Sequence, residues 1–313
     1  MRNFSAEETH KALDFPSLVE ALREAFRSDI EVPVRHHHTM ARAEEPDATL
    51  LLMPAWQGER YVGIKIVTVT PGNSSRSLPA ILGVYLLNDG RTGAPLALID
   101  GPMLTLRRTA AASALAADYL ARPDSERLLM VGTGALSTHL IEAHAAVRPI
   151  RSVSVWGRNP EKARAVAASV DLPGIDVTAV ESLEAAVPEA DVISCATLST
   201  EPLVKGAWLR PGQHLDLVGA FTPGMRESDD EAVRRAEVYV DTRAGCLKEG
   251  GDIVQPLTDG VMTANDVVAD LLDMTAGRHA GRSSAEAITL FKSVGTAVED
   301  FAAAQLVVER TDG

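Results

Sequence analysis

The sequence predicts an α/β protein with an N-terminal α+β domain followed by a domain built on a parallel, doubly wound sheet. Its 313 residues exceed one typical domain and suit two. Short strand-like runs joined by short turns fill the first 122 residues, and strands alternate with helices from residue 128 onward. We expect one domain over residues 1–122, completed by a C-terminal helix within 285–313, and a second over 123–284.

The first part of the chain mixes both kinds of secondary structure. Residues 15–26 place Leu18, Leu22 and Phe26 at helical spacing, which predicts an amphipathic helix. Strands are expected at 49–53, 61–69, 81–87 and 95–99, separated by turn-forming residues. An alanine-rich helix is expected at 104–119, before the interruption at Arg122-Pro123-Asp124. Short connections between successive strands indicate an antiparallel or mixed sheet.

The second part repeats strand, helix, strand. Strands are expected at 128–131, 153–156, 177–180, 191–196, 214–218 and 238–240, with helices at 137–146 and 160–170. This alternation predicts parallel strands with helices on both faces. The pattern of residues 285–308 predicts one long, mostly apolar helix.

Composition excludes several classes of protein. A net charge of -13 argues against binding nucleic acid, which needs clustered Lys and Arg. The charged residues Arg2, Glu7 and Glu8 argue against a signal peptide, and no run approaches the ~20 apolar residues of a membrane span. Two cysteines, Cys195 and Cys246, form neither a disulfide framework nor a metal cluster. We therefore expect a cytoplasmic protein without membrane or nucleic-acid partners.

A glycine turn follows the strand expected at 128–131. The run 132–137 has the spacing G-x-G-x-x-S, with Ser137 in place of a third glycine. Gly132 permits a tight turn, and Gly134 lets backbone amides approach a pyrophosphate at the start of a helix. Because the turn stands between a strand and a helix and heads a series of βα units, we interpret it as the dinucleotide site of a Rossmann domain. The alternative is a glycine-rich turn without a ligand.

The residues after the second strand of this domain bear on the choice of nicotinamide cofactor. An acidic residue there would bind the ribose 2′-hydroxyl of NAD, whereas this chain has Arg158 followed by Asn159. Arg158 has the charge and geometry to bind a 2′-phosphate, so we favour NADP(H) over NAD(H), which stays possible. The alternative is a solvated loop arginine. Further cofactor contacts are expected at Ala135, Leu136, Asn159, Thr197, Gly219, Val294 and Gly295.

Several separate motifs resemble the ornithine cyclodeaminase/μ-crystallin family. They are Gly63-Ile64-Lys65-Ile66-Val67, Pro71-Gly72-Asn73, the run from Leu104 to Ala111, and the run from Phe291 to Asp300. The resemblance extends over nearly the whole chain, and the motifs occur in the same order as in the family. It implies a homodimer that pairs through the N-terminal domain, with the C-terminal helix returning to that domain.

The resemblance also implies a substrate site. Arg35, Lys65 and Arg108 match the residues with which the family binds a substrate carboxylate, and we expect Lys65 and Arg108 to be catalytic as well. A planar carboxylate suits a bidentate guanidinium and a second cation. Taken singly, each of these side chains could be an ordinary surface charge. Lys65 stands in an apolar strand, where burying a lone ammonium is costly.

One position departs from the family pattern. Cyclodeaminases and the archaeal-type alanine dehydrogenase carry an aspartate two residues before the Pro-Gly that follows the fifth strand. Phe221 occupies that place here, before Pro223-Gly224. Phenylalanine neither accepts a proton nor pairs with an amine, so it disfavours deamination and could form an apolar wall beside a ring.

Three consecutive histidines, His36-His37-His38, resemble a set of metal ligands, but we do not interpret them as a metal site. Adjacent strand residues point to opposite faces, so three in a row cannot bind one ion from a regular strand. We expect no metal site.

The favoured function is NAD(P)H-dependent reduction of a cyclic ketimine carboxylate, Δ1-pyrroline-2-carboxylate or Δ1-piperideine-2-carboxylate, to L-proline or L-pipecolate. The small-molecule partner would thus be a cyclic imino acid. The alternatives are an ornithine or lysine cyclodeaminase, an alanine or other amino-acid dehydrogenase, and a non-catalytic small-molecule carrier. The sequence identifies neither the ring size nor the proton donor.

Overall fold

The computed structural model describes residues 1–311, which form two compact units. Unit 1 comprises residues 1–109 together with the described C-terminal residues from 297 onward, and unit 2 comprises 110–296. The first boundary falls inside helix α3 (Gly101–Leu120), not at 122/123, and the second falls at 296/297, not at 284/285. The C-terminal helix α11 (Ala297–Thr311) belongs to unit 1.

Unit 1 contains a mixed six-stranded sheet in the order β1-β6-β5-β4-β3-β2. β1 pairs with β6 in parallel, and every other pair is antiparallel. The strands are β1 (Arg2–Phe4), β2 (His36–Met40), β3 (Ala48–Gln57), β4 (Tyr61–Val69), β5 (Ile81–Asp89) and β6 (Pro95–Asp100). The four expected strands correspond to β3–β6, while β1 and β2 were not predicted.

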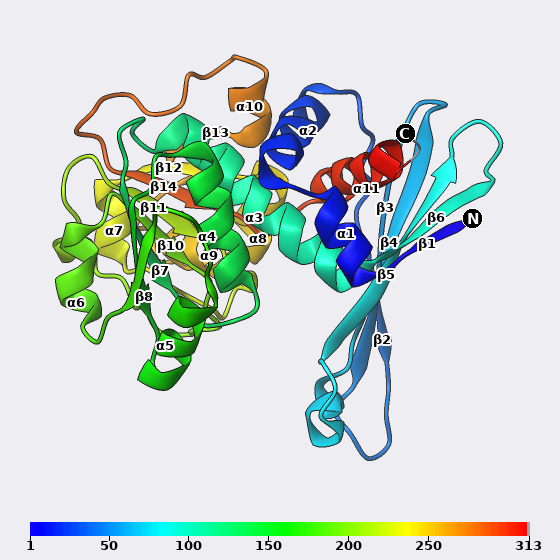
Figure 1. Ribbon diagram of the computed structural model, residues 1–313, viewed down its shortest axis with the longest axis horizontal. Helices are drawn as coiled ribbons and strands as arrows, with labels where there is room; N and C mark the ends of the chain where they lie inside the picture. Colours follow the sequence, from blue (N-terminus) through cyan, green and yellow to red (C-terminus); the bar gives the residue numbers. More distant parts are fainter. Residues whose placement is uncertain (312–313) are drawn as a thin grey trace. The chain divides into compact units, whose positions relative to one another are not determined.

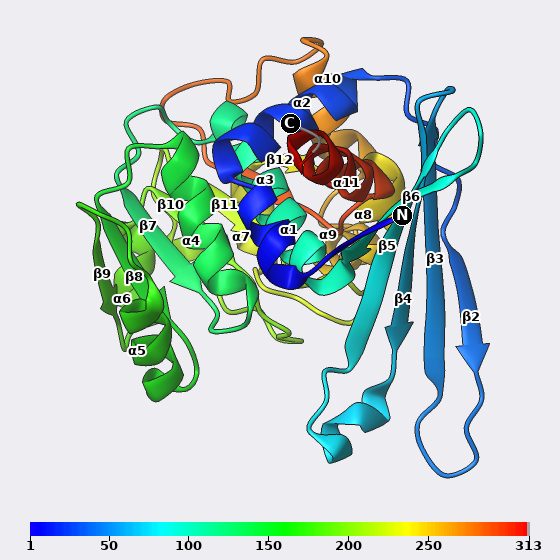
Figure 2. The ribbon, with the colours of Figure 1, turned by 45° about the vertical axis from the view of Figure 1, so that its right-hand side comes forward.

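Unit 1 also contains helices α1 (Ala6–Ala12), α2 (Phe15–Arg27) and α11 (Ala297–Thr311), the short 3-10 helix η1 (Pro71–Arg76) and the first part of α3. A capping box between Ser5 and Glu8 begins α1, and the Asp14 side chain caps α2. α11 packs on β3, β4 and β5, and α2 packs on α11 (Figures 1 and 2). The residues of β4 that face α11 are therefore buried, including Lys65.

Unit 2 contains a parallel eight-stranded sheet in the order β13-β12-β14-β11-β10-β7-β8-β9. The strands are β7 (Arg127–Val131), β8 (Ser152–Trp156), β9 (Asp176–Ala179), β10 (Val192–Cys195), β11 (His214–Leu217), β12 (Glu237–Val240), β13 (Val267–Asp270) and β14 (Thr289–Lys292). From β7 the chain passes to β8 and β9 on one side and then to β10 and β11 on the other. This doubly wound order confirms the Rossmann prediction and puts the topological switch point between β7 and β10.

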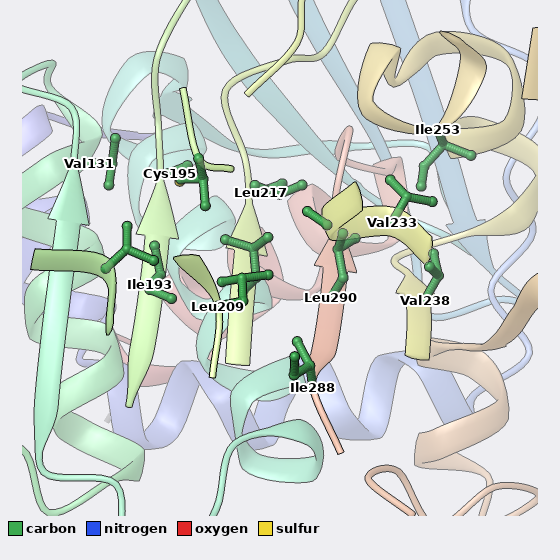
Figure 3. Close-up of a cluster of buried hydrophobic side chains, with 14 of the residues drawn as sticks. Val131, Ile193, Cys195, Leu209, Leu217, Val233, Val238, Ile253, Ile288 and Leu290 are labelled. Atoms are coloured by element: carbon green, nitrogen blue, oxygen red, sulfur yellow. The ribbon is translucent and has the colours of Figure 1, made fainter. Parts of the chain in front are cut away.

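The helices of unit 2 connect these strands. They are α4 (Leu136–Val147), α5 (Pro160–Ser169), α6 (Leu183–Ala186), α7 (Asp230–Arg235), α8 (Arg243–Glu249), α9 (Gly251–Thr258) and α10 (Leu271–Thr275), with short 3-10 turns η2 (Val187–Glu189), η3 (Gly206–Trp208) and η4 (Ala264–Asp266). Side chains from neighbouring strands pack into a continuous apolar core, among them Val131, Ile193, Leu217 and Leu290 (Figure 3). This core fixes the carboxyl ends of the strands, where the functional loops begin.

The prediction of one helix over 285–308 was wrong. Residues 289–292 form β14, which pairs with β11 and β12 in the middle of the sheet, and α11 begins only at Ala297. Gly295, with φ 81°, lies in the connection between them. A short apolar run fits a central parallel strand as well as a buried helix, so hydrophobicity alone did not separate the two. Within the described residues, no helix is long and apolar enough to cross a membrane.

Candidate functional site

A cleft of about 340 Å³ lies at the carboxyl edge of the unit 2 sheet. Its lining comes from the loops after β7, β8 and β10, and therefore from both sides of the switch point, where open α/β sheets bind ligands. The lining residues are Gly132, Thr133, Gly134, Trp156, Gly157, Arg158, Asn159, Lys162, Ala196, Thr197, Leu198, Ser199 and Leu203. Five of the expected cofactor residues thus lie in one cleft: Gly132, Gly134, Arg158, Asn159 and Thr197.

The glycine turn has the geometry that the sequence predicted. Gly132 has φ 132°, and a Cβ there would lie 2.6 Å from the carbonyl oxygen of Ala196. A Cβ on Gly134 would meet no atom within 4 Å, so this backbone faces open space that a ligand can approach. The buried Ser137 hydroxyl donates to the Gly132 carbonyl over 3.0 Å and ties α4 to the turn. These features fit a dinucleotide pyrophosphate at the start of α4.

The end of the cleft after β8 is cationic. Arg158 is exposed, and Lys162 from the first turn of α5 also lines the cleft, whose described lining contains no carboxylate. The Asn159 side chain accepts hydrogen bonds from the backbone N–H groups of Glu161 (2.9 Å) and Lys162 (3.2 Å). Asn159 is therefore the N-cap of α5. Arg158 precedes it in the chain and Lys162 follows it, and both line the cleft.

The remaining expected cofactor residues lie outside this lining. Ala135 and Leu136 begin α4. The backbone N–H of Gly219, after β11, donates to the Glu227 carboxylate over 2.7 Å. The N–H groups of Val294 and Gly295, after β14, each donate to Asp241 Oδ2 over 2.7 Å. Their contact with a cofactor stays a prediction.

Unit 1 holds a buried cluster of two cations and two carboxylates. Lys65 on β4 and Arg108 on α3 lie on either side of Asp300 from α11, with Lys65 Nζ 2.7 Å from Oδ2 and Arg108 Nε 2.9 Å from Oδ1. Arg108 also donates to Glu299 Oε2 over 2.6 Å. All four side chains are buried. The structure therefore brings together two of the three predicted carboxylate-binding residues.

Burial and charge set the protonation of this cluster. Burial lowers the pKa of Lys65 to about 8, although the neighbouring Asp300 opposes this shift and Arg108 adds to it. Burial alone would raise the pKa of Asp300, but Arg108 and Lys65 outweigh burial and hold that pKa below its usual range. The cluster thus carries an ionised Asp300 beside an ammonium that can lose its proton near neutral pH.

The other predicted substrate residues, Arg35 and Phe221, lie outside the buried cluster. Arg35 is half-buried and lies just before β2, which β3 separates from β4. His36, His37 and His38 follow it on β2 and are all exposed. Phe221 lies in the loop after β11 with 41% of its surface exposed.

Sequence reasoning did not assign a role to Glu299, Asp300 or Glu227. Glu299 and Asp300 end the last of the motifs used for the family resemblance, and Glu227 stands three residues after Pro223-Gly224. Membership in that motif was the available signal for Glu299 and Asp300, and nearness to Pro223-Gly224 was the signal for Glu227. Their partners became evident only in the fold.

The fold and its cleft define a Rossmann-type protein with a separate α+β unit that contains a buried cation cluster. Residues 2–313 match the ornithine cyclodeaminase/mu-crystallin family. The chain belongs to this family, as the motifs indicated.

Individual relatives agree with this membership. The Delta(1)-pyrroline-2-carboxylate reductase of Colwellia psychrerythraea is 38% identical over 315 residues, covering 99% of each chain. The solved structure of Thermococcus litoralis Delta(1)-pyrroline-2-carboxylate reductase in complex with NADH and L-proline is 36% identical, with a TM-score of 0.92, and covers 99% of this chain and 97% of that one. An archaeal alanine dehydrogenase dimer with bound NAD is 31% identical, with a TM-score of 0.90, covering 99% of this chain and 96% of that one.

Proposed function

We propose that this protein uses a nicotinamide dinucleotide to reduce cyclic ketimine carboxylates, Δ1-pyrroline-2-carboxylate or Δ1-piperideine-2-carboxylate, to L-proline or L-pipecolate. The observation that carries the proposal is the end-to-end likeness to Delta(1)-pyrroline-2-carboxylate reductases, including one solved with NADH and L-proline. The buried cations of unit 1 and the glycine-turn cleft of unit 2 supply the two kinds of binding that such a reaction needs.

The cleft in unit 2 fits a dinucleotide. Gly132 and Gly134 would leave room for the pyrophosphate, and Arg158 with Lys162 would contact a 2′-phosphate. This pair of cations favours NADP(H) over NAD(H). When bound, the dinucleotide would supply the hydride.

Lys65 and Arg108 would bind the substrate carboxylate, and Arg35 would be a third cation. Asp300 and Glu299 already balance the charges of Lys65 and Arg108. A substrate carboxylate would therefore bind more tightly if it also contacted a cation outside the buried cluster. Lys65, with its pKa near 8, holds a proton at neutral pH and can release it. We therefore propose that Lys65 Nζ also serves as the proton source for the imine, because a protonated imine accepts hydride more readily.

Phe221 distinguishes this function from deamination. A phenyl ring in place of the aspartate neither accepts a proton from an amine nor pairs with an ammonium. It suits a substrate that arrives as a ring with its C=N bond already formed.

We also propose a homodimer that forms through the unit 1 sheet. The sheet face opposite Lys65 carries half-exposed apolar side chains on adjacent strands, with Leu52 beside Ile66 and Ile66 beside Val84. Such a continuous apolar surface fits burial against a second copy. A cytoplasmic location would suit the two free, buried cysteines.

A substrate panel tests the proposed activity. The purified protein is mixed with NADPH or NADH and with Δ1-pyrroline-2-carboxylate, Δ1-piperideine-2-carboxylate or pyruvate plus ammonia, while ornithine is tested with NAD. We expect cofactor oxidation with the cyclic imines and formation of L-proline or L-pipecolate. Turnover confined to ornithine or to pyruvate with ammonia would contradict the proposal, and binding without turnover would indicate a carrier.

A further inference from the structure

One fully buried carboxylate, that of Glu227, joins two loops at the carboxyl edge of the unit 2 sheet. Its Oε1 accepts hydrogen bonds from the backbone N–H (2.6 Å) and the hydroxyl (2.8 Å) of Thr197, in the loop after β10. Its Oε2 accepts from the backbone N–H groups of Gly219 (2.7 Å) and Ala220 (3.2 Å), in the loop after β11. All four partners donate, which suits the ionised, acceptor-only form of the carboxylate. Burial raises the pKa of Glu227 to about 7, although Lys292 and the Thr197 hydrogen bonds oppose this shift, so the ionised form predominates above neutral pH.

The two loops also touch each other directly. A Cβ on Gly219 would lie 2.0 Å from the carbonyl oxygen of Thr197 and 2.6 Å from Glu227 Oε1. Any side chain at Gly219 would therefore force the loops apart. The carboxylate is the group that lets two backbone segments approach this closely, because it satisfies N–H groups from both.

Glu227 is itself held from two sides. Its backbone N–H donates to Asp252 Oδ1 over 2.8 Å, and its carbonyl accepts from the N–H groups of Leu203 and Val204, each over 2.9 Å. Asp252 Oδ2 lies 3.2 Å from Lys292 Nζ at the end of β14, and both side chains are fully buried. The position of the Glu227 carboxylate is thus fixed by α9 and by the central strands.

The loops that Glu227 joins occupy one half of the dinucleotide site. In a doubly wound sheet the two mononucleotide halves of a cofactor bind on opposite sides of the switch point. The glycine turn after β7 and Arg158 after β8 form the side that binds the adenosine half. The loops after β10 and β11 belong to the other side, where the nicotinamide half would bind.

We propose that Glu227 is a positioning residue for the nicotinamide half of the cofactor, acting through the loops that contain Thr197 and Gly219. This inference rests on the proposed dinucleotide binding. In Glu227→Gln one oxygen acceptor becomes an amide donor that faces two hydrogen-bond donors, either the N–H and hydroxyl of Thr197 or the N–H groups of Gly219 and Ala220, so the loops separate. The adenosine side, which Glu227 does not contact, keeps its geometry.

Binding measured by calorimetry without substrate tests this. NADPH is compared with 2′,5′-ADP, and NADH with 5′-ADP, since each shorter ligand carries only the adenosine half. Leaving buried donors unsatisfied costs enough to weaken the whole dinucleotide ~10-fold or more. The affinity for 2′,5′-ADP should stay within about twofold of the wild type, because a difference below ~0.4 kcal/mol lies inside ordinary mutational scatter.

Two further variants separate positioning from general destabilisation. Asp191→Asn alters another largely buried carboxylate that accepts backbone hydrogen bonds, from Glu126 (3.0 Å) and Arg127 (2.9 Å), but at the amino end of β10. It should leave the ratio of NADPH to 2′,5′-ADP affinity unchanged. Thr197→Val removes the hydroxyl that donates to Glu227 and that accepts from the Ser199 N–H over 3.3 Å. It should weaken NADPH slightly and selectively.

The outcomes are distinct. Equal weakening of NADPH and 2′,5′-ADP in Glu227→Gln, or the same change in Asp191→Asn, would overturn the positioning role. Unchanged NADPH affinity in both Glu227→Gln and Thr197→Val would overturn it as well. Failure of the wild type to bind either dinucleotide would instead refute the proposed function, and this inference with it.

Discussion

Replacing Asp300 with asparagine removes a negative charge from between the two buried cations of unit 1. Asp300 Oδ2 lies 2.7 Å from Lys65 Nζ, and its charge opposes the lowering of the Lys65 pKa by burial. Without that charge the pKa of Lys65 falls further below about 8. If Lys65 must be protonated for imine reduction, the variant loses activity at a lower pH than the wild type.

The size of this shift follows from the strength of the lost contact. A charge-assisted hydrogen bond contributes ~1.5–3 kcal/mol, and one pH unit corresponds to about 1.36 kcal/mol. The wild-type kcat/KM should therefore fall as the pH rises through about 8, and in Asp300→Asn the midpoint should move down by roughly one to two pH units. The two proteins should differ least at the acid end of the pH range, where Lys65 is most fully protonated in both.

Two features of the cluster should let this variant fold. Glu299 still pairs with Arg108 over 2.6 Å, and Lys65 can release its proton instead of staying buried as an unpaired charge. Thermal unfolding by circular dichroism measures the remaining loss of stability. The assay itself is NADPH oxidation with Δ1-pyrroline-2-carboxylate between about pH 5.5 and 9.5, a range of about four pH units that lies below the ordinary lysine pKa of about 10.4.

Glu299→Gln is the matched control. Glu299 is the neighbouring residue on α11, is equally buried and contacts the same Arg108, but its influence on the pKa of Lys65 is weaker than that of Asp300. The midpoint should move less in this variant. An unchanged profile in Asp300→Asn, or an equal shift in Glu299→Gln, would refute Lys65 as the titrating group.

Three further predictions concern the cofactor, the substrate and the assembly. Arg158→Ala should weaken NADPH more than NADH, by ~1.5–3 kcal/mol for a lost charge-assisted phosphate contact; equal effects in a binding titration would remove Arg158 from the 2′-phosphate site. Wild type should not convert ornithine to proline when supplied with NAD; proline and ammonia release by the wild type would contradict this. Phe221→Asp should impair imine reduction, because Phe221 is 41% exposed in the free protein and a carboxylate there would have to be desolvated when the ring of the substrate covers it. Leu86→Glu puts a charge on the half-exposed face of β5 and should shift the protein toward monomers in analytical ultracentrifugation, which an unchanged dimer would refute.

Much of the fold was predictable because the information for it is local. The strand 61–69 is rich in β-branched residues and bounded by turn residues, and it forms β4 with the expected limits. The glycine turn at 132–137 was recognisable because a tight turn and a close ligand need specific residues. The strand at 289–292 was missed since its place depends on β11 and β12, which are distant in sequence.

The cations of unit 1 were predictable only in part. Lys65 was conspicuous because an ammonium in an apolar strand needs a partner. That partner, Asp300, stands at the beginning of α11, where an acidic residue is ordinarily explained by the helix dipole. Nothing local distinguishes an acid that stabilises a helix from one that also binds a lysine on another element.

Glu227 shows a stricter limit on prediction from sequence. Three of its four hydrogen-bond donors are backbone N–H groups, and a backbone amide is the same whatever residue carries it. Substituting Ala220, for example, would leave its N–H in place, so the identity of that residue holds no trace of the contact. Gly219 does, because the space between the two loops admits no side chain, and Thr197 does through its hydroxyl, which is the fourth donor. A carboxylate that organises loops mainly through main-chain contacts therefore leaves a glycine, a threonine and an unexplained acidic residue in the sequence, and the fold is needed to connect the three.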